Sequence, residues 1–418
     1  MGIDGLPSQL KVDGKYVSQV QPEMLHGKKL GVDAFVWLHR VVSKASNDDD
    51  YCRRFHAEPQ VPFYEHLYNF LDAELRFWKS LGMEVILVVD GKANPIKASV
   101  DTKRRAGRDK QVDALKAFMT TGAAEGGKKL KGLAKDACHV TREVVTYFLQ
   151  WANENSVALI GAPMEAEHQL VYMQNKGEIE WIYTVDSDVL PLCATNVIYE
   201  VKWDRGNFTL WAFTHDLVVK FFEEEVMTKK GSFRRDDFVA YCIFLGCDYC
   251  DRIPSVGPAT LNKSFKAVWA EKSADDKVAF LVDLEEYGQY TFEAAMQGRN
   301  TVAGKEPVSG YRVCFSEAFA GLTSPCVASL HDEQLCRSVF RMPFDRPDWH
   351  TGDLDDNKVP VWPGYEVDDI KTAFGVAMKM PNNLYTLERW ARYPDEDPSA
   401  CLPKYPTIEG VTFQHPLV

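Results

Sequence analysis

Short apolar runs that end beside acidic residues are the feature of this sequence that most restricts its fold. The runs occupy residues 30–32, 85–89, 157–162 and 181–185, and the acids that follow them are Asp33, Asp90, Glu165 and Asp186. Continuous β-branched stretches of this length are typical of strands buried on both faces of a parallel sheet. Helical patterns at 63–81 and 142–152 lie between them. The alternation predicts an α/β fold with the acids at the carboxyl ends of the strands, where such sheets bind ligands.

Composition and charge limit the class of protein. The chain has 418 residues, 45% of them hydrophobic, which excludes a wholly disordered protein. No apolar run approaches the roughly 18 residues of a spanning helix, so no membrane association is expected. The net charge is −12, which argues against a broadly basic nucleic-acid surface. The segment 92–142 nevertheless holds 13 Lys or Arg against 5 Asp or Glu, so this part of the chain can bind a polyanion locally.

The ten cysteines are spread along a chain with no recognisable export signal, which predicts reduced thiols in the cytosol or nucleus. Cys247 and Cys250 form the one close pair. A second pair at zinc spacing is absent, so buried thiols are favoured and a zinc site is the alternative.

Seven acids are candidates for metal binding, namely Asp33, Asp90, Glu165, Glu167, Asp186, Asp188 and Asp248. A single Asp at a strand end is usually a turn or cap residue. Seven carboxylates at one sheet edge repel one another unless cations offset their charge. Ligand sets made only of oxygen favour hard cations, so we expect two Mg²⁺ ions, with Mn²⁺ able to substitute. Paired ions of this kind suit the attack of water on a phosphodiester.

Residue spacing predicts how four of these acids are presented. Asp186 and Asp188 are two residues apart, and on a strand they would point to one face. Glu165 and Glu167 have the same spacing but are expected at an irregular entry into a helix, where the helix N-terminus favours negative charge. His168 follows directly and is expected to be a packing residue rather than a ligand.

The sequence resembles the flap endonuclease, XPG and exonuclease-1 superfamily of structure-specific 5′ nucleases, and most closely its exonuclease-1 branch. The matching motifs are Met1-Gly2-Ile3-Asp4-Gly5-Leu6, Gly31-Val32-Asp33, Val89-Asp90-Gly91, Ala162-Pro163-Met164-Glu165-Ala166-Glu167, Asp186-Ser187-Asp188 and Leu245-Gly246-Cys247-Asp248-Tyr249. They occur in family order over about residues 1–270, and the similarity continues more faintly to about residue 390. The resemblance implies a PIN-like, mostly parallel central sheet and makes all seven acids metal ligands.

The resemblance also implies a domain organisation. The expected regions are an N-terminal nuclease region at 1–96, a helical arch at 97–140, an internal nuclease region at 141–235, a helix–two-turn–helix element at 236–270, a C-terminal part of the nuclease domain at 271–390 and a C-terminal extension at 391–418.

Further site residues follow from the resemblance alone. Lys97 and Arg104 lie seven and fourteen residues after Asp90 and are expected, with Asp186, to be catalytic by acting on the scissile phosphate. On a helix these two positions share a face. The DNA contacts implied are Gly2, His39, Arg105, Arg108, Val256 and Gly257, with K⁺ at the helix–two-turn–helix element. Two residues depart from the family pattern. Val185 stands where the family usually has an acidic residue next to the metal ligands, and Ser255 replaces a glycine that is common in the hairpin expected to bind K⁺.

The sequence thus predicts a monomeric, nuclear, Mg²⁺-dependent 5′→3′ exonuclease with 5′ flap endonuclease activity. Its expected partner is double-stranded DNA with a nick, gap, free 5′ end or 5′ flap, in repair, recombination or replication, and its protein partners are unknown. Three alternatives stay open: a dedicated flap endonuclease, a catalytically silent DNA-binding relative, and a PIN-type ribonuclease.

Overall fold

The computed structural model describes residues 2–45, 61–91, 94, 97–120, 132–133, 140, 142–162, 164–297, 304–305, 307–323, 325–329 and 334–337. The predicted C-terminal extension lies outside the described residues, as do most of the second half of the predicted arch and residues 338–390.

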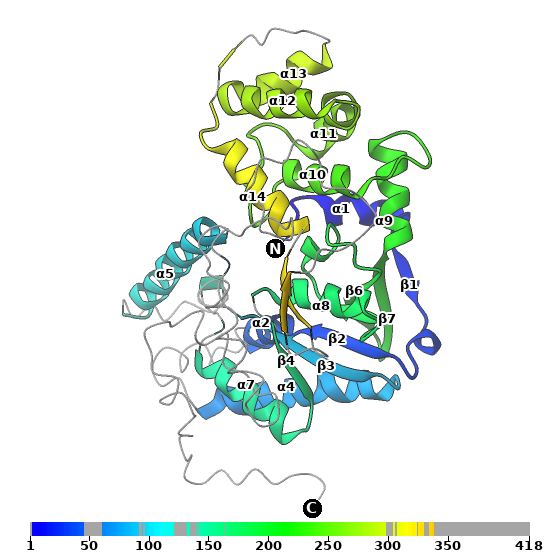
Figure 1. Cartoon of the computed structure of the whole chain (residues 1–418). Coiled ribbons are helices and arrows are strands. Elements are labelled where there is room, and N and C mark those ends of the chain that lie inside the picture. The colour runs from blue at the N-terminus through cyan, green and yellow to red at the C-terminus, as the bar shows by residue number, and fades with distance from the viewer. Residues whose placement is uncertain are drawn as a thin grey trace, which may run out of the picture.

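A seven-stranded sheet forms the centre of the part of the chain up to Thr214 (Figure 1). Its strands are β1 Ser18–Val20, β2 Lys29–Asp33, β3 Glu84–Val89, β4 Ala158–Gly161, β5 Trp181–Tyr183, β6 Asn196–Asp204 and β7 Asn207–Thr214. The order across the sheet is β1-β7-β6-β5-β2-β3-β4. All pairings from β4 to β6 are parallel, whereas β7 pairs antiparallel with both β6 and β1. The prediction of a mostly parallel sheet built from the four apolar runs is confirmed.

Helices cover both faces of this sheet. The helices of the sheet region are α1 Leu6–Lys11, α2 Ala34–Ala45, α4 Val61–Ser80, α7 Arg142–Glu154, α8 Ala166–Asn175 and α9 His215–Phe221. On one face α2, α4 and α7 bury a core with the fully enclosed rings of Trp37, Trp78 and Trp151. On the other face α8 packs against β2, β3 and β5. Trp37 is therefore a core residue.

The close packing of α8 on the sheet depends on Gly31 in the middle of β2. A Cβ atom at this position would lie 2.5 Å from Ile179 and 2.6 Å from Leu170, distances that no real side chain tolerates. From Ala166 to Gln174 every residue of α8 is buried. The side chain of Gln174 satisfies this burial by donating to the carbonyls of Glu180 and Asn196, each at 3.1 Å. Because α8 is fixed along its length, its N-terminus has a defined place at the sheet edge.

A helical region follows the sheet in sequence and lies above it in Figure 1. Its helices are α10 Arg235–Leu245, α11 Pro258–Phe265, α12 Ala274–Tyr287, α13 Gln289–Met296 and α14 Tyr311–Thr323, followed by a hairpin of β8 Cys326–Ser329 and β9 Gln334–Arg337. The aromatic core around Phe244 and Trp269 joins these helices. The second helix of the predicted helix–two-turn–helix element begins at Pro258, a residue favoured at the first helical position.

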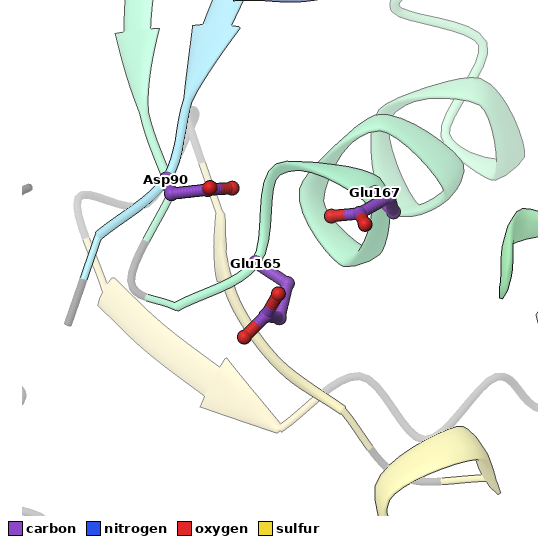
Figure 2. A group of neighbouring side chains, drawn as sticks. All are labelled: Asp90, Glu165 and Glu167. Atoms are coloured by element: carbon purple, nitrogen blue, oxygen red, sulfur yellow. The ribbon is translucent and has the colours of Figure 1, made fainter. Parts of the chain in front are cut away.

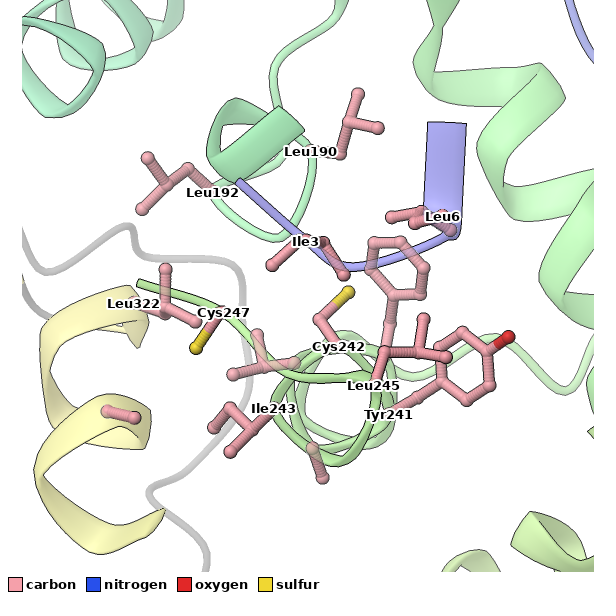
Figure 3. Packing of buried hydrophobic residues seen from close by; sticks show 14 of the residues in the cluster. Ile3, Leu6, Leu190, Leu192, Tyr241, Cys242, Ile243, Leu245, Cys247 and Leu322 are labelled. Carbon is pink, nitrogen blue, oxygen red and sulfur yellow. The ribbon is translucent and has the colours of Figure 1, made fainter. Parts of the chain in front are cut away.

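The N-terminal segment joins the sheet to the helical region. Figure 3 shows Ile3 and Leu6 packed between α10 and the turn that carries Leu190. The amide of Asp4 donates to the carbonyl of Gly246 at 2.8 Å. These contacts hold the start of the chain against the end of α10, and both lie next to the carboxyl edge of the sheet.

The first half of the basic segment contains a long helix, α5 Ala98–Thr120, which projects from the body of the molecule (Figure 1). Leu115 is buried, while most other described side chains along it are exposed. Among the described residues, no helix is long and apolar enough to span a bilayer.

Candidate metal centre

Three acids form a first cluster at the end of β3 and the start of α8 (Figure 2). Asp90 directly follows β3, Glu165 is the residue before α8, and Glu167 lies in the first turn of that helix. One carboxylate oxygen from each lies within 4.8 Å of the others. The amide of Ala166 donates to Asp90 at 2.8 Å, so the helix N-terminus supports the negative charge. Glu165 lies at an irregular strand-to-helix entry, as expected, whereas Glu167 is already part of the first turn of α8.

Asp186, Asp188 and Asp248 form a second cluster with the same spacing, and all three are buried. The expectation that Asp186 and Asp188 lie on a strand is wrong, since β5 ends at Tyr183. The carboxylate of Asp186 instead accepts the amide of Asp188 at 3.0 Å and caps a 3₁₀ turn, Ser187–Val189. Asp side chains favour such local backbone bonds over a continued strand.

Asp33 lies at the end of β2 and joins the acids without belonging to either cluster of three. Its carboxylate accepts the amide of Phe35 at 2.9 Å and the hydroxyl of Thr184 at 3.2 Å. Burial raises its pKa to about 8, and the neighbouring charges of Asp90 and Asp186 add to this effect. The structure therefore brings all seven predicted acids to one edge of the sheet.

Two basic side chains enter this edge from the start of α5. The ammonium of Lys97 lies 2.7 Å from Glu165 and 3.8 Å from Asp248. The guanidinium of Arg104 donates to Asp248 at 2.7 Å. Lys97 thus touches both clusters, and two of the acids are ion-paired with the chain's own cations. A metal ion that used Glu165 or Asp248 as a ligand would share it with these two side chains.

Burial and mutual repulsion disturb the acids strongly. Burial raises the pKa of Glu167 and of Asp188 well above the ordinary carboxyl range, and that of Asp186 in the same direction. Burial would lower the pKa of Lys97, but the charges around it, Glu165 foremost, raise that pKa well above its usual value. Lys97 is therefore a permanent buried cation among carboxyl groups that are costly to ionise.

The donor set fits a hard divalent cation. Neither carboxylate oxygen of Asp188 has a hydrogen-bond partner among the described residues, although both are buried. Buried carboxylates without partners are costly, and a metal ion is the usual compensation. All ligand atoms in both clusters are oxygens, which suits Mg²⁺ or Mn²⁺.

Gly2 lies directly against the second cluster. Its φ is +85°, and a Cβ atom there would lie 2.3 Å from Asp186 and 2.5 Å from the hydroxyl of Ser187. The next amide, that of Ile3, donates to the same hydroxyl at 2.8 Å. Position 2 therefore has no room for a side chain.

The other predicted DNA contacts lie on exposed surfaces or in a turn. His39, on α2, and Arg105 and Arg108, on α5, are exposed to solvent. Val256 is buried, and its amide donates to the carbonyl of Ile253 at 3.2 Å, so neither its side chain nor its N–H faces solvent freely. The roles of these residues in binding DNA stay predictions.

Ser255, which replaces a common glycine of the family, lies in the turn before α11. Ser255 has a φ of +63°, a conformation that glycine adopts more easily. The carbonyl of Gly257 accepts the amides of Thr260 and Leu261 at 3.1 and 3.0 Å and so starts α11. Nothing in the structure tests the predicted K⁺ site.

Sequence reasoning missed or undervalued three residues beside the acids. The hydroxyl of Thr184 links two of them, because it donates to Asp33 and accepts the amide of Asp186 at 3.1 Å. Tyr249 and His168 form a buried pair, with the Tyr249 hydroxyl 3.0 Å from Nε2 of His168. Burial lowers the pKa of His168 to about 3, which agrees with a packing role rather than with a charged group. The sequence did contain a signal for this pair, because Tyr249 directly follows Asp248 and His168 directly follows Glu167.

Cys247 and Cys250 are free, buried thiols that pair through their backbones, with N–H···O distances of 2.9 and 3.2 Å. Among the described residues, the clusters able to hold a metal contain only carboxylates. Both thiols are buried, as the sequence predicts.

Comparison with known proteins places this edge in a family. Residues 1–111 match the XPG N-terminal domain, and residues 156–248 match the XPG I-region. Exonuclease 1 of Drosophila melanogaster is 25% identical over 279 residues, which are 67% of this chain and 35% of that protein. Flap endonuclease 1 of Drosophila yakuba is 25% identical over 264 residues, or 62% of this chain and 63% of that protein. The chain thus spans about a third of the length of the exonuclease relative.

Among solved structures, the catalytic core of Rad2 in complex with DNA substrate is similar, with a TM-score of 0.48, 16% identity, and coverage of 92% of this chain and 97% of that one. The two regions that match the XPG family models, 1–111 and 156–248, contain both acidic clusters and the two basic residues that contact them. Over these two regions the chain is therefore similar to the flap endonuclease, XPG and exonuclease-1 superfamily of 5′ nucleases.

Proposed function

We propose that the chain is a metal-dependent nuclease that degrades double-stranded DNA from the 5′ end and also cuts 5′ flaps. The observation that carries this proposal is the pair of oxygen-only clusters with the buried Lys97 ammonium in contact with both. No group that could act as a covalent nucleophile is needed, since hydrolysis of a phosphodiester relies on charge stabilisation and positioning.

The acids and bases divide the work of this site. Divalent ions held by the two clusters would supply Lewis acidity and activate water at the reacting phosphate. Lys97 and Arg104 would leave Glu165 and Asp248 for the phosphate oxygens as DNA enters, and would neutralise the charge that grows there. The hydrogen bond from Thr184 to Asp33 would hold the Asp33 carboxylate in place beside the other acids.

The basic helix α5 and the helical region would bind the DNA. Arg105 and Arg108 are exposed on α5 and would contact phosphates of the 5′ strand, as part of an arch at 97–140. The turn at Val256 and Gly257, in the predicted helix–two-turn–helix element at 236–270, would contact the duplex, with K⁺ as its cation. His39 would lie against the exposed base pair. A monomer acting in the nucleus completes the proposal.

Cleavage of end-labelled DNA with Mg²⁺ tests this function. Asp186→Ala should abolish cleavage and leave binding, measured with Ca²⁺ in place of Mg²⁺, nearly unchanged. Persistent cleavage by this variant would refute the assignment. A wild-type protein that binds DNA but never cuts it would instead be the catalytically silent relative.

Substrate comparison separates the alternatives. An exonuclease should release short products from a recessed 5′ end at a rate comparable with its cutting of a 5′ flap. A dedicated flap endonuclease should cut the flap and degrade the recessed end slowly. Preference for RNA over DNA of the same shape would favour a PIN-type ribonuclease.

A further inference from the structure

We propose that Tyr249, anchored by His168, positions the Lys97 ammonium between the two acidic clusters, so that Tyr249 and His168 are positioning residues of the site. The inference rests on the proposed function, because the role of Lys97 in cleavage does. It concerns two buried side chains that are not themselves metal ligands.

The ring of Tyr249 forms one wall around the Lys97 ammonium. Nζ of Lys97 lies 4.9 Å from the ring centroid, and the lysine is only 6% exposed. A cation over the face of an aromatic ring is stabilised by the ring's quadrupole, and more so when it is shielded from water. Glu165 at 2.7 Å and Asp248 at 3.8 Å are the ammonium's charged neighbours. The ring is thus a neighbour of the cation in addition to these two carboxylates.

His168 fixes the ring that forms this wall. The Tyr249 hydroxyl lies 3.0 Å from Nε2 of His168, and the two rings are nearly parallel, 14° apart. Both side chains are buried, at 3% and 0% exposure, so water cannot substitute for this contact. A lysine side chain has four rotatable bonds, so a rigid wall reduces the positions open to its ammonium.

The pair also joins the two clusters through the backbone. His168 directly follows Glu167 of the first cluster, and Tyr249 directly follows Asp248 of the second. A contact between these two side chains therefore fixes the separation of the segments that carry the acids. The contact between Tyr249 and His168 therefore sets both the position of Lys97 and the distance between the two clusters.

A double-mutant cycle distinguishes positioning from simple packing. Single-turnover cleavage of a 5′ flap substrate is measured for Tyr249→Leu in the wild type and in the Lys97→Ala background. If Tyr249 acts through Lys97, Tyr249→Leu should slow cleavage by about ten-fold in the first case and by less than about two-fold in the second. Tyr249→Phe keeps the aromatic ring, so its cleavage rate should fall less than that of Tyr249→Leu. Equal losses in both backgrounds would overturn the proposal.

Tyr241 supplies a matched control, because it is a buried tyrosine whose hydroxyl contacts Asn262 at 2.6 Å. Tyr241→Leu should slow cleavage by the same factor in both backgrounds. Thermal melting of each variant shows whether the fold is kept.

A second measurement does not require cleavage. In NMR spectra of lysine labelled with ¹³C at Cε, the Lys97 signal is the one lost in Lys97→Arg. It should shift in Tyr249→Leu, shift less in His168→Gln than in His168→Leu, and stay in place in Tyr241→Leu. An unmoved signal in Tyr249→Leu would overturn the positioning role. A protein that shows these shifts and cuts no DNA would refute the proposed function and leave the positioning role intact.

Discussion

The two acidic clusters have the same number of carboxylates but balance their charge differently. In the first cluster Asp90 accepts a helix-terminal amide, and Glu165 is paired with Lys97 at 2.7 Å. In the second cluster all three acids are buried, and both oxygens of Asp188 lack a partner among the described residues. Asp248 of the second cluster is ion-paired with Arg104 at 2.7 Å, and Asp186 accepts the amide of Asp188 at 3.0 Å. The difference between the clusters therefore lies in Asp188, the acid that depends most on a bound cation.

The sharpest test of this difference compares Asp188→Asn with Glu165→Gln in the absence of metal. Asp188→Asn replaces a buried carboxyl group that has no partner and that can stay in the metal-free fold only by taking up a proton, so the free energy of unfolding should rise by about 1–2 kcal/mol. Glu165→Gln leaves the Lys97 ammonium buried with a weaker partner, so the free energy of unfolding should fall by about 2 kcal/mol in this variant. Denaturant unfolding in EDTA measures both. Changes of the same sign in the two variants would show that the clusters are alike.

The stability of the metal-free protein should fall as pH rises from about 6.5 to 8.5. The folded-state pKa of Asp33 is raised to about 8, and those of Glu167, Asp186 and Asp188 are also raised, so the folded state holds protons that the unfolded state has lost. The stability from such groups is complete below their unfolded pKa and is lost as pH rises through the folded pKa. His168, with a pKa lowered to about 3, stays neutral in this window.

Melting curves in EDTA at several pH values measure this slope. Asp33→Asn should flatten it, and Mg²⁺ should flatten it further because the ions offset the ionised carboxylates. A melting temperature that rises with pH in EDTA would contradict the raised carboxyl pKa values.

Lys97→Met tests whether the ammonium competes with metal for the first cluster. Removing the cation frees Glu165, so Mn²⁺ should bind about ten-fold more tightly, while cleavage slows because the phosphate loses a positive neighbour. Calorimetric titration and single-turnover cleavage give the two numbers. Weaker Mn²⁺ binding would mean that Lys97 organises the ligands instead of competing for them.

The smallest effect is expected at the surface pair between Lys103 and Asp251. These side chains are 2.7 Å apart but 65% and 75% exposed, so Lys103→Ala should change the free energy of unfolding by no more than about 0.5 kcal/mol. Asp251→Asn should do the same. A larger loss in either variant would show that this contact fastens α5 to the body, in contrast with the buried pair at Lys97.

The parallel core was predictable because β-branched runs buried on both faces leave little choice of structure. The hairpin of β6 and β7 was not predicted, although its turn at Arg205 and Gly206 has positive φ at both residues, which favours tight hairpins. Asp186 was misassigned because its capping bond to Asp188 competes with the strand. The contact of Lys97 with Glu165 spans 68 positions, and no local pattern reports such a pairing.

The tight fit at Gly31 has a consequence for reading genetic variants of this chain. A side chain there would overlap Cδ1 of Ile179 and Cδ2 of Leu170, so these two buried side chains, or α8 with them, would have to shift. Because α8 carries Glu167, a shift of the helix would lower activity while every ligand residue remained intact. A screen that scores only loss of activity would place Gly31 among the active-site residues, and a stability assay would be needed to classify it as a defect of the scaffold.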